Sequence, residues 1–115
     1  DVPEINNING DFLLNTGSPH FVRFVNNLSK EEIIKTGREI RYSSQYKKEG
    51  INVNLVEKKS RQSLSCETYE RGVEDETLSC GTGVTAVALA ANYHFNLPSP
   101  LKIITKGGQL WVGFS

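Results

Sequence analysis

The residues best suited to chemistry are Cys80 and the glycines that follow it in Cys80-Gly81-Thr82-Gly83. The apolar run Val84 to Ala91 comes directly after them and predicts a helix that begins at these glycines. The first turn of a helix leaves N–H groups without intrahelical partners, and these groups and the helix dipole favour negative charge. A thiol placed there should have its pKa lowered from about 8.5 into the range of roughly 3.5–7.5. We therefore interpret Cys80 as a thiolate base or nucleophile beside a backbone cradle for an anion.

A structural interpretation of Cys80 competes with this one, because free cysteines are most often small buried hydrophobic residues. The Glu70-Arg71-Gly72 string upstream favours the chemical interpretation of this region, because the planar guanidinium of arginine can bind a carboxylate with two N–H donors. Glu70 and Arg71 would point to opposite faces of a strand unless the strand ends at Gly72. The plainer alternative is a surface ion pair, which contributes little to stability.

The string Tyr69-Glu70-Arg71-Gly72, followed by Glu76-Thr77-Leu78 and Ser79-Cys80-Gly81-Thr82-Gly83, resembles the diaminopimelate epimerase family. The resemblance continues through residues 16–20, 51–54 and 107–112 and covers nearly the whole chain. Members of that family are roughly twice as long, a length typical of two domains. The resemblance therefore implies that residues 1–115 form a single domain equivalent to the C-terminal half of such an enzyme, without its N-terminal half.

The activity implied by the resemblance is cofactor-independent epimerisation of LL- and meso-diaminopimelate, in the biosynthesis of lysine and of peptidoglycan precursors. Inverting an α-carbon requires a base on one face of the carbon and an acid on the other. In the family both groups are cysteines, so this chain would supply Cys80 and the missing half would supply the second. Neither pyridoxal phosphate, another cofactor nor a metal is expected.

The resemblance also implies roles for particular residues. The catalytic group comprises the thiol and the two residues that tune its proton affinity, which are Cys80, Glu70 and His20. The substrate-binding group is Ser18, Asn52, Glu70, Arg71, Gly81 and Thr82.

Within the binding group, the N–H groups of Gly81 and Thr82 would hold the α-carboxylate at the helix start. Arg71 and Asn52 would bind the far end of the substrate. Ser18 stands where the family usually has asparagine, and its hydroxyl can still donate and accept a hydrogen bond.

Two of these residues have plainer interpretations when the resemblance is set aside. A lone histidine such as His20 is more often a hydrogen-bonded polar residue than a catalytic one. Asn52 shares a strand face with Asn54, which is typical of an exposed face. The resemblance gives no role to Asn54.

The composition narrows the class of partner. Thirteen basic and thirteen acidic residues leave no net charge, so nothing favours binding to nucleic acid or to an acidic membrane. No apolar run is long enough to span a bilayer, no signal peptide opens the chain, and two cysteines are too few for a disulfide framework. We therefore expect a cytoplasmic domain whose partners are a small amino-acid substrate and the missing half. The face left by that half could also support a homodimer. The absence of methionine suggests a fragment or a processed piece.

The expected fold is of the α+β class, a mixed and mostly antiparallel sheet of six to eight strands wrapped around the helix of residues 84–91. Asn9-Gly10 predicts a hairpin turn, and Gly107-Gly108 predicts a second hairpin near the C-terminus. A short outer helix is expected from Lys30 to Thr36, started by a capping box of Ser29 and Glu32 and stopped by Gly37.

Three functional alternatives remain open. Proline racemase and the phenazine-biosynthesis isomerases share the expected fold, although the Glu-Arg-Gly string favours the diaminopimelate enzyme. A thiol redox protein could use Cys80 with Cys66 as its partner, but Cys66 shares a strand face with Leu64 and is predicted to be structural. The third alternative is a half-domain that binds a ligand without catalysis.

Overall fold

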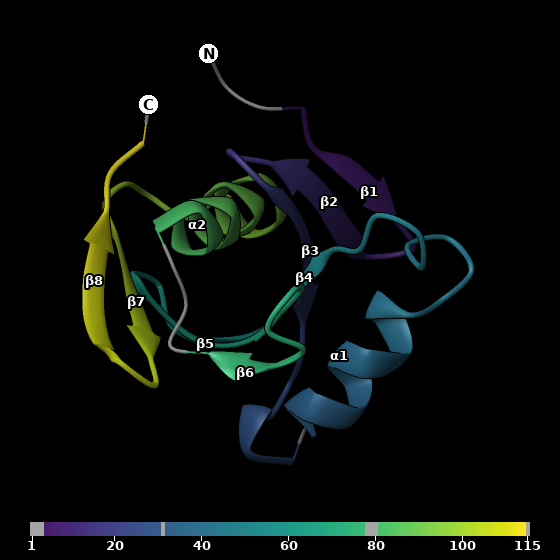
Figure 1. Cartoon of the computed structure of the whole chain (residues 1–115). Helices are drawn as coiled ribbons and strands as arrows, with labels where there is room; N and C mark the ends of the chain where they lie inside the picture. Colours follow the sequence, from purple (N-terminus) through teal and green to yellow (C-terminus); the bar gives the residue numbers. More distant parts are fainter. Residues whose placement is uncertain (1–3, 31, 78–80, 115) are drawn as a thin grey trace.

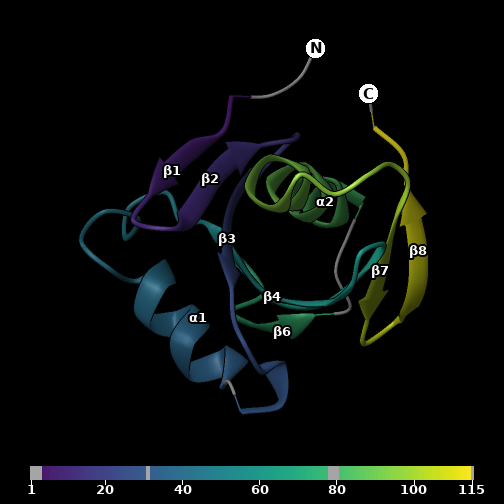
Figure 2. The same cartoon turned by 180° about the vertical axis from the view of Figure 1, so that it is seen from behind.

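The computed structural model describes residues 4–30, 32–77 and 81–114. One curved sheet wraps around helix α2 (Gly81–Phe95), and helix α1 (Ile33–Arg41) covers the outer face of the sheet (Figures 1 and 2). A short 3₁₀ helix, η1 (Leu28–Lys30), precedes α1. The strands are β1 (Asn6–Ile8), β2 (Asp11–Asn15), β3 (Pro19–Phe24), β4 (Asn52–Ser60), β5 (Ser63–Glu70), β6 (Asp75–Thr77), β7 (Leu101–Thr105) and β8 (Gly108–Val112).

The sheet is mixed and mostly antiparallel, as predicted. Its strand order in the described part of the chain is β1-β2-β3-β4-β5-β7-β8, with β6 paired to β5 beside this path. Only the β3–β4 and β5–β7 pairs are parallel among these strands. The expected class and the expected range of six to eight strands are therefore confirmed.

Both predicted hairpins form. Asn9 and Gly10 link β1 to β2 with φ values of 54° and 89°, the positive values that a two-residue primed turn needs. The second hairpin joins β7 to β8, but its turn lies one residue earlier than predicted. Gly108 already pairs with Thr105, so the turn consists of Lys106 and Gly107.

Helix α2 is buried at the centre of the fold, as its apolar sequence predicted. Its side chains pack on the inner face of the sheet, in a core that includes Phe12, Val22, Leu64 and Leu101. A second core lies between α1 and the outer face of the sheet. No helix in the described ranges is both long and apolar enough to cross a membrane.

Helix α1 differs from its prediction. It runs from Ile33 to Arg41, so Gly37 lies in its interior rather than at its end. Ser29 belongs to the preceding 3₁₀ helix, and Glu32 caps α1 without a side-chain hydrogen bond, so no capping box forms. The reason for the glycine is contact with the sheet, because a Cβ at position 37 would lie 2.4 Å from the Cβ of Tyr69.

We predict that Gly37→Ala destabilises the domain although alanine is the better helix former by about 1 kcal/mol. The added methyl group meets the stem of the buried Tyr69, so α1 must move away from the sheet, at a cost of about 1–3 kcal/mol. Urea unfolding measures the change in free energy. Glu39→Ala, at an exposed site of the same helix, should change it by no more than about 0.5 kcal/mol. A stabilised Gly37→Ala variant would contradict the close approach of α1 to Tyr69.

Candidate functional site

The inner face of the sheet changes from apolar to polar toward the start of α2. Successive inward-facing residues pass from Val22 to His20 in β3, from Val56 to Asn54 and Asn52 in β4, and from Cys66 to Thr68 and Glu70 in β5. The register sets these polar side chains side by side, with His20 opposite Asn52 and Asn54 opposite Thr68. The polar end of this face forms the candidate site.

Three predicted site residues meet at the start of α2. The Nε2 atom of His20 lies 3.1 Å from the Thr82 hydroxyl and 3.2 Å from the Ser18 hydroxyl. The two hydroxyl oxygens lie 3.2 Å from each other. Thr16 donates its hydroxyl proton to the Thr82 carbonyl over 2.6 Å, which ties the turn before β3 to the helix. The structure thus brings together residues more than sixty positions apart in the sequence.

His20 is a neutral imidazole at neutral pH. Burial lowers its pKa, and the positive charge of Arg71 lowers it further, from 6.5 to about 4. Only 1% of the residue is exposed. His20 therefore contributes an N–H donor and an acceptor nitrogen to the site, but no positive charge.

Asn52 links both sides of the site through its amide. Its Nδ2 donates to the Pro19 carbonyl at 3.2 Å and to the Ser18 hydroxyl at 3.4 Å. Its Oδ1 accepts the backbone N–H of Arg71 at 3.0 Å. These contacts hold the end of β5 against the start of β3, and the contact of Asn52 with a substrate stays a prediction.

Glu70 and Arg71 lie where β5 ends, as the sequence analysis required. Gly72 follows with a φ of +87°, and the Arg71 guanidinium donates to the Glu49 carbonyl over 2.8 Å. The carboxylate of Glu74 accepts both the Gly72 N–H and the Arg41 Nε–H at 3.0 Å. Burial alone would raise the pKa of Glu74, but hydrogen bonds from Gly72, Tyr42 and Arg41 outweigh burial and lower it. The ion pair between Arg41 and Glu74, together with the Gly72 hydrogen bond, therefore forms a clamp that holds this turn in place.

The start of α2 is open to a ligand on the side of Gly81. Gly81 is exposed, and a Cβ built on it would lie within 4 Å of none of the described residues outside its own helix. Thr82 is partly buried and faces His20. Cys80, the predicted catalytic thiol, lies outside the described residues, so its role stays a prediction.

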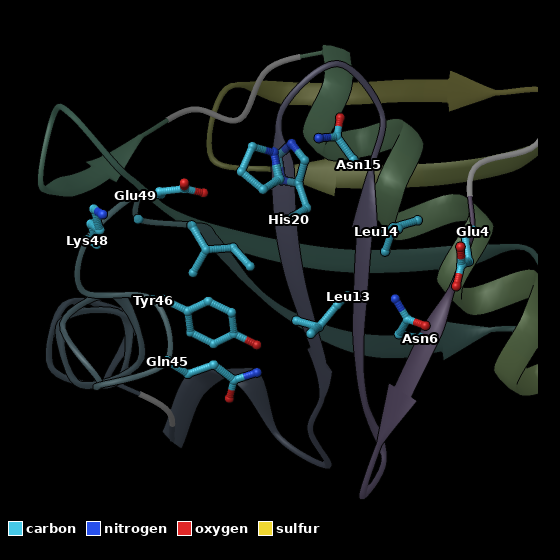
Figure 3. A pocket seen from close by; sticks show the side chains of 13 residues that line it. Glu4, Asn6, Leu13, Leu14, Asn15, His20, Gln45, Tyr46, Lys48 and Glu49 are labelled. Carbon is cyan, nitrogen blue, oxygen red and sulfur yellow. The ribbon is translucent and has the colours of Figure 1, made fainter.

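A separate cavity of about 720 Å³ lies between the β1–β2 hairpin and the loop before β4, and His20 forms part of its lining (Figure 3). Leu13, Tyr46 and Ile51 contribute to its apolar lining. Among the described residues, His20 alone belongs both to the cavity lining and to the predicted site, so we place the candidate site at the start of α2. In the described part of the chain, no three His, Cys, Asp or Glu residues are grouped so that they could hold a metal.

Three residues that support the site were not predicted from the sequence, and these are Thr16, Asn54 and Thr68. Asn54 and Thr68 are buried and bonded to each other, whereas the spacing had suggested an exposed face for Asn54. Thr68 lies on the same face of β5 as Cys66, and the strand pattern of β5 alone does not reveal its contact with Asn54 in β4. Cys66 is 3% exposed and packed in the core, as predicted for a structural cysteine.

Comparison with known proteins finds relatives that are named diaminopimelate epimerase. The sequence model of the family described as "Diaminopimelate epimerase" matches residues 12–114. The diaminopimelate epimerase of Flavobacterium psychrophilum is 47% identical over 116 residues, which cover 100% of this chain and 45% of the relative. The enzyme of that name from Aquifex aeolicus is 44% identical over 105 residues, 89% of this chain and 37% of the relative. The chain thus spans less than half the length of these relatives.

Solved structures with the same fold include phenazine biosynthesis proteins of the PhzF family. The protein from Enterococcus faecalis has a TM-score of 0.68 at 18% identity, covering 87% of this chain and 35% of its own. The protein from Bacillus anthracis has a TM-score of 0.65 at 18% identity, covering 98% and 34%. At this level of identity the likeness shows the fold alone.

We predict that His20 makes the domain less stable as pH falls from 7 to 5. The pKa of the His20 imidazole is near 6.5 in the unfolded state and about 4 in the folded state. As the pH falls over this range, the imidazole therefore gains a proton in the unfolded state but not in the folded state. The free energy of unfolding should therefore fall by about 2 kcal/mol through this residue over that interval. Urea unfolding at both pH values measures it, and His20→Gln should remove this part of the loss. An equal loss in the wild-type and variant proteins would show that His20 is not buried as a neutral ring.

Proposed function

The chain belongs to the diaminopimelate epimerase family, and from that premise we propose that it is one half of an enzyme that interconverts LL- and meso-diaminopimelate. The observation that carries the proposal is the meeting of Ser18, His20 and Thr82 at the start of α2. Cys80 immediately precedes this helix in the sequence. We therefore propose that the Cys80 thiol acts next to the start of α2 and to the neutral imidazole of His20.

The proposed reaction removes the α-proton from one face of the substrate and returns a proton to the other. Cys80 is the acid or base on one face, and a second cysteine in the other half serves the opposite face. The N–H groups of Gly81 and Thr82 bind the α-carboxylate and stabilise the charge that develops on it in the transition state. Glu70 and His20 tune the proton affinity of Cys80.

The far end of the substrate carries a second amino-acid group, which Arg71 and Asn52 are proposed to bind. Arg71 is suited to the carboxylate because its guanidinium can make two parallel hydrogen bonds. Ser18 adds a hydroxyl where the side chains of His20 and Thr82 converge. The clamp between Arg41 and Glu74 supports this arrangement by holding the turn that follows Arg71.

The partner of this chain in the proposed enzyme is the N-terminal half, which would complete the cleft. The enzyme would act without a cofactor in the cytoplasm, in the synthesis of lysine and of peptidoglycan precursors. A homodimer that forms through the face left by that half is a further proposal.

We predict that the 115-residue chain alone does not epimerise diaminopimelate, because one thiol cannot serve both faces of the α-carbon. Adding the separately produced N-terminal half, or using the full-length protein, should produce turnover. Separation of the LL and meso stereoisomers by chiral chromatography measures the turnover. Cys80→Ser in the full-length protein is the control, and it should lose the interconversion of the two stereoisomers. Rapid epimerisation by the isolated chain would refute the two-base proposal.

We also predict that Cys80 is alkylated roughly tenfold or more faster than Cys66 at pH 7. A thiol at a helix start is largely thiolate, whereas Cys66 is 3% exposed and packed in the core. Iodoacetamide labelling of Cys66→Ala and Cys80→Ala separates the two rates. A disulfide between the two cysteines after mild oxidation would favour the redox alternative. Equal alkylation rates would contradict the activation of Cys80.

A further inference from the structure

A buried polar network lies behind His20, and the proposed reaction has not used it. Asn54 is fully buried and Thr68 is 3% exposed. Burying an amide and a hydroxyl is unfavourable unless hydrogen bonds replace those lost to water. The partners of these two side chains therefore show what they hold in place.

The Asn54 amide has only one orientation that satisfies its neighbours. One of its terminal atoms lies 3.2 Å from the Phe21 carbonyl, which can only accept a hydrogen bond, so this atom is Nδ2. The other, Oδ1, accepts the Thr68 hydroxyl proton over 2.8 Å. The Cys66 thiol also faces Oδ1, at 4.0 Å. Turning the amide over would set two acceptors against each other at Phe21.

This orientation determines which nitrogen of His20 carries the proton. Asn54 Nδ2 also lies 3.1 Å from Nδ1 of the imidazole, so Nδ1 must accept and cannot be protonated. The single proton of the neutral ring then lies on Nε2. That nitrogen faces the hydroxyls of Ser18 and Thr82 at the start of α2.

We propose that Asn54, oriented by Thr68 and the Phe21 carbonyl, is a positioning residue that fixes the Nε2–H tautomer of His20. His20 then presents a donor to the start of α2 without adding a positive charge there. Such a donor stabilises negative charge, whether on a thiolate or on a substrate carboxylate, through a hydrogen bond. This catalytic consequence rests on the proposed function, but the tautomer itself does not.

The first test is ¹⁵N NMR of the imidazole nitrogens in the 115-residue chain at pH 7. The chain has two histidines, and His94→Gln identifies the signals of the second. We expect a protonated, pyrrole-type Nε2 and an unprotonated, pyridine-type Nδ1 in His20. A protonated Nδ1, or an even mixture of the two tautomers, would overturn the proposal without any variant.

The second test is Asn54→Asp, which replaces the donor beside Nδ1 with a carboxylate that only accepts. We expect a proton on Nδ1 of His20 in this variant, seen as a pyrrole-type shift of that nitrogen. Asn92→Asp is the matched control, because the Asn92 amide bonds the Leu97 carbonyl at 2.7 Å, away from the site. The control should leave the His20 shifts unchanged. An Asn54→Asp protein in which Nδ1 stays unprotonated would show that Asn54 does not set the tautomer.

The third test measures turnover of diaminopimelate by the full-length enzyme. Asn54→Asp should lower kcat by roughly 10²–10⁴-fold, the range for general acid–base contributions, with KM changing much less. Asn92→Asp should retain the parent kcat. A proton on Nδ1 with unchanged kcat would overturn the positioning role. If the parent enzyme showed no epimerisation while the wild-type NMR pattern held, the proposed function would fail and the tautomer assignment would stand.

Discussion

The contact between the His20 imidazole and the Thr82 hydroxyl is the interaction on which the site depends. It joins the sheet to the first turn of α2 across 62 positions of sequence. A shift of helix α2 along the sheet would break this contact. Apolar side chains fill the rest of the interface between the helix and the sheet. The polar contact therefore sets where the helix begins relative to β3, while the apolar core supplies the attraction that holds the helix in place.

The cost of this arrangement is a cluster of buried polar groups within a small core. His20, Asn52, Asn54 and Thr68 are each at most 5% exposed, and each is hydrogen-bonded. In a low-dielectric interior such bonds strengthen one another, and an unpaired member would be strongly unfavourable. The cluster consequently has one satisfied arrangement, which keeps the side chains rigid at the place where the proposed chemistry needs fixed geometry.

The sequence predicted those features that depend on local pattern. Helix α2 followed from its apolar run, the first hairpin from Asn9-Gly10, and the shared face of Leu64 and Cys66 from the alternation of side chains along a strand. Features that depend on distant contacts were not predictable in this way. Gly37 looked like the end of a helix because only Tyr69, 32 positions further along, explains a glycine inside α1. Asn54 looked exposed because its partner His20 lies on a parallel neighbour, which no spacing within β4 reveals.

The open side of the site argues for a second surface above it. Gly81 is exposed, and a Cβ built on it would contact none of the described residues outside its own helix. Removing an α-proton requires a site from which water is excluded, because the interactions that stabilise the developing charge are weak in water. In the proposed enzyme this domain would provide the floor of such a site, with Gly81 at the start of α2 left exposed. On the proposed function, the other half must therefore do two things at once: supply the second thiol and close the cleft over the first.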